Sequence, residues 1–303
     1  MPSHVPVMED IVTALAAGCR RVVDATVGEG GHAERFRDAG AHVLAVDRDP
    51  EALATARRRV GEEDMQWQLG CFADPAVLRG IADFRPDFVL LDLGVSSPQL
   101  DRDERGFSFR PGVPLDMRMD GAGGTAAEFL NRSPQPTLER AFREFGDERR
   151  AGRLAREVVR RRQRQPFTTS DDLVNAVRGA LGPRTGPGDF ARLFQAVRIA
   201  VNDELDQLRV ALPAMRDALQ PDGRIVVISY HSGEDRIVKR CFREWVRVCV
   251  CPPEQPTCTC RGRALGELDP RRPLRPTGEE IAANPRARSA ILRGFRYHGE
   301  PAR

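Results

Sequence analysis

The chain has 303 residues, of which 41% are hydrophobic and 30% are charged, and its formal net charge is +3. This composition is that of an ordinary soluble protein, and the length fits one large domain or two moderate ones. No apolar run approaches the roughly 20 residues of a membrane helix, and residues 1–10 lack the basic start and apolar stretch of a secretory signal. We therefore expect a cytoplasmic protein with no membrane partner and no strong overall field that attracts nucleic acid.

Strands and helices alternate over the first part of the chain. The predicted elements are strands at residues 21–26, 41–46, 65–69 and 88–91, and helices at residues 5–15, 32–39 and 50–60. Strands that alternate with helices at this spacing predict an α/β fold with a parallel, doubly wound sheet.

The alternation stops near residue 105. A loop rich in glycine and proline follows, and after it only helical patterns occur until a strand at residues 224–229. The predicted helices span residues 137–145, 148–163, 170–181 and 191–208. We therefore expect two domains. Residues 1–105 and 209–303 form a discontinuous α/β domain, and residues 106–208 form an inserted, all-helical domain.

A glycine-rich turn follows the first predicted strand. Gly28, Gly30 and Ala33 fit the G-x-G-x-x-A pattern, which lets the backbone approach a nucleotide closely. Asp47 ends the next strand, where an acid can accept hydrogen bonds from ribose hydroxyls. The pattern does not separate NAD from S-adenosylmethionine, because both carry an adenosine ribose at this place. A tight turn without a ligand is the alternative interpretation.

A second polar segment follows the fourth predicted strand, at the edge where open α/β sheets bind ligands. Asp92 comes first, and Ser96, Ser97, Pro98 and Gln99 complete the segment. Their order resembles the Ser/Asp-Pro-Pro-aromatic loop of enzymes that methylate exocyclic amino groups, which can orient an amine toward a methyl donor. The segment favours S-adenosylmethionine over NAD, because no histidine, tyrosine or lysine that could handle a hydride is evident there. A capped strand-to-helix turn is the alternative.

Two arginine-rich segments are candidates for contact with nucleic acid. In the loop of residues 105–120, Phe107 and Phe109 can stack on bases, or else they lie buried in a linker between domains. The predicted helix after it can follow a phosphate backbone or can be an ordinary solvated face. Its arginines are Arg149, Arg150, Arg153, Arg156, Arg160, Arg161, Arg162 and Arg164.

A histidine follows the strand at residues 224–229. His231 is a candidate acid, base or contact to a nucleobase, because it lies at the carboxyl end of a strand. Ser232 and Asp235 fit a helix capping box, which is the structural alternative. Both interpretations can hold, with Ser232 capping the helix and His231 facing the cleft.

Four of the seven cysteines come in two close pairs, Cys249 with Cys251 and Cys258 with Cys260. Four thiolates can bind zinc, but the gap of one residue within each pair is shorter than the usual gap of two to four. A reduced, thiol-rich loop is the favoured interpretation, so no metal site is predicted, and zinc stays open as the alternative.

Over almost its whole length, the chain resembles the RsmH (MraW) family of bacterial small-subunit rRNA cytosine-N4 methyltransferases. The segments that carry the resemblance include DATVGEGGH from residue 24, LLDLGVSSPQLD from residue 90, PLDMRMD from residue 114 and ISYHSGEDRIVK from residue 228. The resemblance implies a class I, Rossmann-like methyltransferase with an inserted helical domain. It also implies the reaction, which is S-adenosylmethionine-dependent N4-methylation of one cytidine in the decoding region (P site) of 16S rRNA in the small ribosomal subunit.

The resemblance also assigns residues to the cofactor. These are Gly30, Gly31, His32, Asp47, Phe72, Asp92 and Gln99. We expect Ser96, Ser97 and Pro98 to position the cytosine amine, and Asp116 and His231 to be the candidate proton acceptors.

Three other functions remain as alternatives: methylation of another nucleic-acid amine, including one in DNA, a nucleotide-binding RNA-assembly factor without catalysis, and a dehydrogenase. The sequence also leaves open whether the protein forms a homodimer and whether its substrate is the assembled subunit or free RNA.

Overall fold

A computed structural model describes residues 6–252, 254–255 and 257–299, except for the side chains of Ser97 and Pro98. The contacts within the chain divide it into two compact units. We call them the sheet unit, formed by Met1–Gly94 and Asp206–Arg303, and the helical unit, formed by Val95–Leu205. The two divisions fall earlier in the chain than the sequence-based boundaries at residues 105/106 and 208/209.

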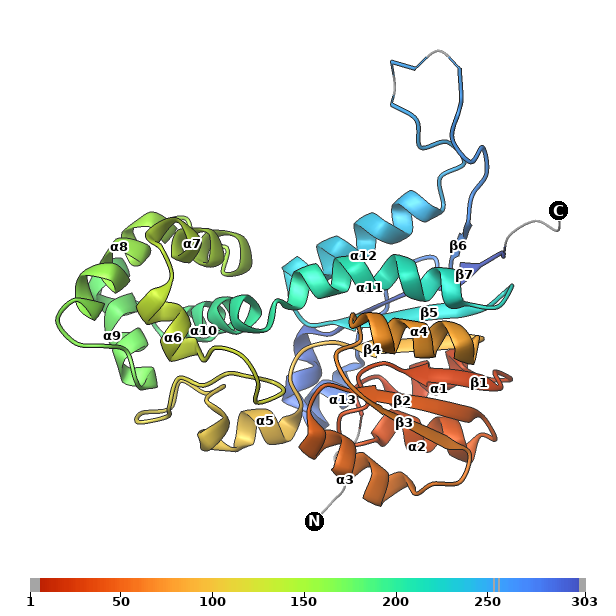
Figure 1. Cartoon of the computed structure of the whole chain (residues 1–303), viewed down its shortest axis with the longest axis horizontal. Helices are drawn as coiled ribbons and strands as arrows, with labels where there is room; N and C mark the ends of the chain where they lie inside the picture. The colour runs from red at the N-terminus through yellow and green to blue at the C-terminus, as the bar shows by residue number, and fades with distance from the viewer. Residues whose placement is uncertain (1–5, 253, 256, 300–303) are drawn as a thin grey trace. The chain divides into compact units, whose positions relative to one another are not determined.

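The sheet unit is built on a seven-stranded sheet with the order β3-β2-β1-β4-β5-β7-β6 (Figure 1). Its strands are β1 (Arg21–Asp24), β2 (His42–Asp47), β3 (Met65–Leu69), β4 (Phe88–Asp92), β5 (Arg224–Ser229), β6 (Gly266–Leu268) and β7 (Ile291–Tyr297). Strands β1 to β5 pair in parallel, whereas β7 runs antiparallel between β5 and β6. The order reverses at β1 and β4, as in Rossmann-like sheets, and this confirms the predicted fold class.

Helices cover both faces of this sheet. They are α1 (Glu9–Leu15), α2 (Gly31–Asp38), α3 (Pro50–Val60), α4 (Pro75–Phe84), α11 (Glu204–Ala218), α12 (Ser232–Trp245) and α13 (Gly278–Ala283), followed by a 3-10 turn, η3 (Pro285–Ser289). Alternate strand residues face opposite sides, so Val22 and Leu90 share one apolar cluster with Phe36 of α2 and Val60 of α3. Burial on both faces explains why the parallel strands have continuous apolar runs in the sequence.

The helical unit contains α5 (Ser97–Asp101), η1 (Asp103–Arg105), α6 (Ala126–Arg132), α7 (Gln135–Arg140), the π-helical turn η2 (Ala141–Phe145), α8 (Ala151–Arg162), α9 (Ser170–Leu181) and α10 (Pro187–Asn202). It has an apolar core of its own, with Leu130, Phe142, Leu154 and Leu193 among its buried residues. The expected all-helical insertion is therefore confirmed. Among the described residues of the chain, no helix is long and apolar enough to cross a membrane.

One helix prediction is wrong. The spacing of apolar residues predicts a single helix over residues 191–208, but the chain breaks between α10 and α11 at Asp203. Asp203 has a φ of 53°, and a residue in the left-handed conformation ends a helix. The guanidinium of Arg198 pairs with the carboxylate of Glu204 across the break, with an Nε–Oε1 distance of 2.8 Å. The break places Asn202 at a helix end.

Candidate cofactor and substrate site

The carboxylate of Asp47 closes the glycine turn after β1. One of its oxygens, Oδ2, accepts a hydrogen bond from the backbone of Gly28 at 2.9 Å, and Oδ1 accepts one from the backbone of Asp49 at 2.8 Å. Burial raises the pKa of Asp47, and the backbone donors of Asp49, Gly28 and Arg48 act in the opposite direction. A carboxylate has about four lone-pair positions, so Asp47 keeps capacity for one further donor, such as a hydroxyl of a ribose.

The three glycines of this turn have different tasks. Gly30 has a φ of 84°, and a Cβ there would lie 2.9 Å from Cγ2 of Val60, so this glycine lets α2 pack closely on α3. A Cβ on Gly31 would lie 2.3 Å from Cγ of Pro6. Only Gly28, with a φ of 52°, has open space where its Cβ would be. The structure therefore gives Gly30 and Gly31 a packing role and leaves Gly28 as the glycine that a ligand can approach.

His32 and Asp92 face each other at the strand edge. Nε2 of His32 lies 3.7 Å from Oδ2 of Asp92. Neither ring nitrogen of this buried histidine makes a hydrogen bond of good geometry among the described residues, although the backbone of Val7 lies close enough to favour the protonated ring. Burial lowers the pKa of His32 to about 4 and raises the pKa of Asp92 to about 7. The imidazole is therefore neutral at pH 7, and the contact is not an ion pair. A buried polar atom without a hydrogen bond of good geometry marks a place where a ligand can bind.

Tyr230, which directly follows β5, completes this group. Its hydroxyl donates a hydrogen bond of 2.8 Å to Oδ1 of Asp92, and its backbone N–H donates to Oε2 of Glu234. Burial, together with the neighbouring Asp92 carboxylate, raises the pKa of Tyr230 well above its usual value. Tyr230 therefore stays protonated and holds Asp92 by one oxygen, which leaves the other oxygen turned toward His32.

Phe72 lies just beyond the end of β3. The ring is half-buried, and no aromatic or cationic side chain of the described residues packs on it. An aromatic face without such a partner at a strand end can stack on a flat ring such as adenine. The ends of four parallel strands at one edge of the sheet unit are thus followed by Gly28, His32, Asp47, Phe72 and Asp92.

His231 caps α12 and so occupies the position that we expected for Ser232. Its Nδ1 accepts hydrogen bonds from the backbones of Gly233 and Glu234 at 3.2 and 3.4 Å. Its Nε2 lies 3.1 Å from Oε1 of Glu234, in a direction that does not make a hydrogen bond. The capping box is formed by His231 and Glu234, so the predicted box of Ser232 with Asp235 is wrong. Asp235 instead pairs with Arg293 of β7 at 2.7 Å.

The helical unit contains the other predicted residues. Ser96 precedes α5, and its backbone N–H donates to Oε1 of the buried Gln99 at 3.1 Å. This bond closes the turn before α5, as the capped-turn interpretation expected. The side chains of Ser97 and Pro98 lie outside the described residues. An adenine contact by Gln99 stays a prediction.

Asp116 lies in the loop between η1 and α6, where Arg118 holds both of its oxygens. The guanidinium donates to Oδ1 at 2.8 Å and to Oδ2 at 2.7 Å, and the backbone of Arg118 donates to Oδ1 as well. Burial alone would raise the pKa of Asp116, but the bonds from Arg118 outweigh it and the pKa lies below its usual value. Asp116 must therefore give up a contact with Arg118 before it can take a proton.

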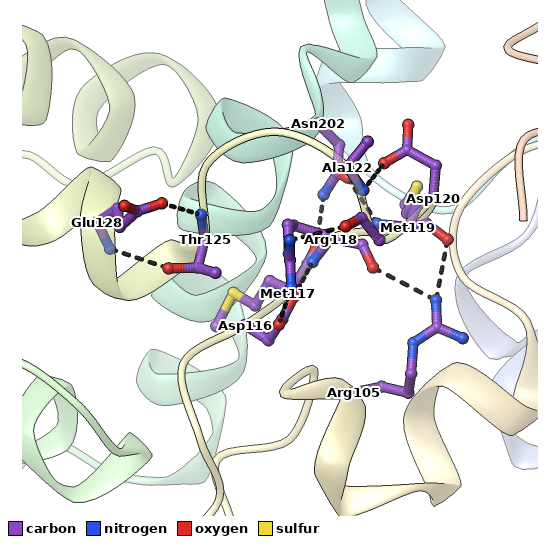
Figure 2. A network of polar contacts seen from close by, with 11 residues as sticks. Arg105, Asp116, Met117, Arg118, Met119, Asp120, Ala122, Thr125, Glu128 and Asn202 are labelled. Carbon is purple, nitrogen blue, oxygen red and sulfur yellow. Dashed lines mark hydrogen bonds and ion pairs between the residues drawn. The ribbon is translucent and has the colours of Figure 1, made fainter.

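The same loop is tied to α10 by one amide (Figure 2). Oδ1 of Asn202 accepts from the backbone of Met119 at 2.9 Å, and its Nδ2 donates to the carbonyl of Met117 at 2.7 Å. From the other side, the guanidinium of Arg105 donates to the carbonyl of Met119 at 2.9 Å. Asn202 is buried, so its role in this network is structural.

The phenylalanines of the loop belong to the core of the helical unit. Phe107 is buried, and the ring of Phe109 lies 6.1 Å from that of Phe190 and 6.0 Å from that of Phe194. The buried interpretation therefore holds for Phe107, whereas Phe109 is partly buried and packs against the same core. Stacking on bases would require either ring to leave these contacts.

The arginines of α8 and of the turns that flank it separate into two groups. Arg150 and Arg162 donate to backbone carbonyls, and Arg161 pairs with Glu157. Of the remaining exposed arginines, three lie on α8 three to four residues apart, opposite its buried face, and the other two lie in the turns just before and after the helix. We call these residues together the arginine stripe, and its members are Arg149, Arg153, Arg156, Arg160 and Arg164. Within it, Arg160 pairs with Glu157.

Comparison with known proteins shows the family of the chain. The model of the MraW methylase family matches residues 1–298. The chain belongs to the MraW methylase family. The sequence did not single out Tyr230 and Glu234, which the structure links to Asp92 through the Tyr230 hydroxyl and backbone, although both lie in the segment directly after β5 that carries the resemblance.

Relatives in the family match over almost their whole length. A Gemmatimonas aurantiaca protein named Ribosomal RNA small subunit methyltransferase H is 53% identical over 298 residues, covering 97% of this chain and 95% of the relative. Proteins of the same name from Rubrobacter xylanophilus and Heliobacterium mobile are 47% and 42% identical, and cover 99% and 96% of this chain and 97% of each relative.

Proposed function

We propose that the protein transfers a methyl group from S-adenosylmethionine to N4 of one cytidine in 16S rRNA, in the decoding region (P site) of the small ribosomal subunit. Membership of a methylase family and the names of the relatives support methylation of small-subunit rRNA. The observation that carries the proposal is the edge of the sheet, where the carboxylates of Asp47 and Asp92 and the neutral ring of His32 lie at the ends of neighbouring parallel strands.

The residues at this edge fit the cofactor. S-adenosylmethionine, when bound, supplies an electrophilic methyl group on a positively charged sulfur. Asp47 would hold the ribose, Phe72 would lie on the adenine with Gln99, and Gly28, Gly30, Gly31 and His32 would line the turn. Asp92 would complete the pocket and offer its negative charge to a cationic ligand.

The segment proposed to position the amine would lie close to Asp92 along the chain. Ser96 follows Asp92 by four residues, so the chain between them spans at most about 14 Å. Ser96, Ser97 and Pro98 would accept hydrogen bonds from the cytosine amine and restrict its orientation, which is the main help that a methyl transfer needs. The target base would have to leave its stack to reach this segment.

Asp116 and His231 remain the proposed proton acceptors, and each has a contact to release first. Nδ1 of His231 is used by the helix cap, and this fixes the proton of a neutral ring on Nε2, facing Glu234. Asp116 is held by Arg118. Release of one of these contacts on substrate binding is therefore part of the proposal.

The test is methyl transfer from labelled S-adenosylmethionine to small ribosomal subunits that lack the modification, followed by nucleoside analysis. We expect label in N4-methylcytidine at a single position. Cofactor binding without incorporation would instead indicate an assembly factor without catalysis, and label in another nucleoside would contradict the assignment of the amine. The same assay on free 16S rRNA and on DNA identifies the form of the substrate.

The raised pKa of Asp92 predicts how cofactor binding depends on pH. If the ionised carboxylate binds the cation, the ionised fraction rises about tenfold between about pH 6 and about pH 8, because the pKa is about 7. The affinity for S-adenosylmethionine should then rise about tenfold over this range. Titration calorimetry at several pH values measures it. The other groups around Asp92 are Tyr230, Glu234, Asp24 and the neutral His32.

Two variants identify the group that titrates. Asp92→Asn should bind the cofactor more weakly and with no rise in affinity across this range. Asp24→Asn, which removes a neighbouring buried carboxyl, should keep most of the rise. An undiminished rise in Asp92→Asn would show that another group is responsible.

The arginine stripe predicts the salt dependence of binding to the small subunit. Arg153 and Arg156 are exposed, and no described residue pairs with them. Each phosphate contact contributes about 0.7 to 0.9 to the slope of log affinity against log salt. Reversal of both charges, in Arg153→Glu/Arg156→Glu, should reduce this slope by about 1.5 and weaken binding at least about tenfold at low salt.

The matched control is Arg271→Glu/Arg272→Glu, which makes the same change of charge on exposed arginines of the sheet unit. Filter binding to small subunits between about 50 and 200 mM salt compares the two variants. Equal slopes in both variants would exclude the stripe from the RNA-binding surface.

A further inference from the structure

The segment between α12 and β6 has no core of its own. It leaves the end of α12 at Val246 and returns at Leu265, whose backbone N–H donates to the carbonyl of Trp245 at 2.8 Å (Figure 1). We call residues 246–265 the cysteine finger. None of its described residues is buried. Small lobes that cannot bury apolar surface usually depend on disulfides or metal ions for their structure.

The four cysteines of the finger converge on one point. Sγ of Cys258 lies 3.8 Å from that of Cys249, 4.0 Å from that of Cys251 and 3.5 Å from that of Cys260. Sγ of Cys260 lies 3.9 Å from that of Cys249, and all four sulfur atoms are within 4.8 Å of one another. The four thiols therefore form a cluster rather than two separate pairs.

These distances match a tetrahedral thiolate site. With a zinc–sulfur distance of about 2.3 Å, the sulfur atoms of a regular tetrahedron are about 3.8 Å apart. The short gap within each pair, which weighed against zinc in the sequence, proves compatible with it, because Cys258 and Cys260 bring their sulfur atoms to 3.5 Å. The backbone N–H of Val250 also donates to Sγ of Cys260 at 3.3 Å, and such a bond favours a thiolate.

We propose that Cys249, Cys251, Cys258 and Cys260 bind one zinc ion, and that this ion holds the cysteine finger in its fold. The site is closed, with four protein ligands, so its role is structural and independent of methyl transfer. Two disulfides could join the same four cysteines, but each would hold its two sulfur atoms about 2.05 Å apart. The four sulfur–sulfur distances given above are instead similar to one another. Tetrahedral thiolate sites hold zinc or iron, and the test separates these metals.

The experiment is metal analysis of the full-length protein, purified under reducing conditions, incubated with zinc chloride and dialysed. We expect about one zinc ion per chain in the wild type. The double variant Cys249→Ser/Cys258→Ser should retain at least about tenfold less. Cys241→Ser, which removes a thiol of α12 outside the cluster, is the matched control and should retain as much zinc as the wild type.

A second readout uses the wild type loaded with cobalt, and the melting temperature checks that the double variant is folded. Wild-type protein loaded with cobalt chloride should show the thiolate-to-metal absorption bands of a tetrahedral site, and the double variant should lack them. The melting temperature of the double variant should stay close to that of the wild type, because the finger contributes no buried residue among those described. Absence of zinc and cobalt from the wild type, equal zinc in the double variant, iron in place of zinc, or disulfides found by mass spectrometry would each overturn the proposal.

Discussion

We expect the wild type to lose about 3 kcal/mol of stability between about pH 5.5 and about pH 8.5, and the variant Asp24→Asn not to show this loss. Asp24 ends β1 and is buried, and its only hydrogen bond among the described contacts is from the backbone of Thr26, at 3.3 Å. Burial raises its pKa to about 8, and the carboxylates of Asp92 and Asp47 add to the shift. Asparagine has nearly the same shape and no charge to lose.

The sign follows from the protons that each state binds. Between the unfolded pKa of about 3.9 and the folded pKa, the native state keeps the proton of Asp24 and the unfolded state releases it. Stability therefore falls as pH rises through this window, and the fall ends above a pH of about 8. Any slope that remains in the variant belongs to other groups, among them Asp92 and Asp47.

Urea unfolding at several pH values, followed by circular dichroism without cofactor, measures this difference. The matched control is Asp38→Asn, which removes an exposed carboxylate of α2 and should leave the pH profile of the wild type unchanged. Parallel profiles for the wild type and Asp24→Asn would show that Asp24 is ionised in the native state. That result would also change the electrostatics proposed for Asp92.

Much of the sheet unit could be predicted because its information is local. Continuous apolar runs mark strands buried on both faces, and the acids Asp47 and Asp92 follow such runs directly. Strands β6 and β7 were missed because β7 reads Ile-Leu-Arg-Gly-Phe-Arg-Tyr, in which arginines interrupt the apolar pattern. Its place between β5 and β6 depends on pairing between segments far apart in the sequence.

The contacts between distant residues could not be predicted. The sequence shows that Asp92 and Tyr230 each follow a strand, but their hydrogen bond depends on β4 and β5 being neighbours. The glycine pattern predicted a ligand site, but it could not tell that Gly30 and Gly31 face Val60 and Pro6. Local pattern therefore predicted the edge of the sheet, and only the packing showed which atoms remain open to a ligand.

The loop around Asp116 also depends on a contact between distant residues, because Asn202 of α10 holds it. The second large effect is expected from the loss of this contact. Replacement of Asn202 by alanine should destabilise the helical unit by about 3 kcal/mol. The change leaves the backbone N–H of Met119 and the carbonyl of Met117 without the amide that pairs with them. Each buried backbone group that loses its partner costs about 1 to 3 kcal/mol.

The measurement is thermal and urea unfolding of the full chain, combined with limited proteolysis in the loop of residues 105–122. Asn131→Ala is the matched control, because Asn131 also bridges backbone groups, those of Phe167, but is only half-buried. Asn131→Ala should lower the free energy of unfolding less than Asn202→Ala does, because water can replace the amide of Asn131. If Asn202→Ala is as stable as the wild type and no more sensitive to protease, the network does not hold the loop. If the loop loosens as expected, methyl transfer by this variant at a temperature where it stays folded will show whether the position of Asp116 matters to the reaction.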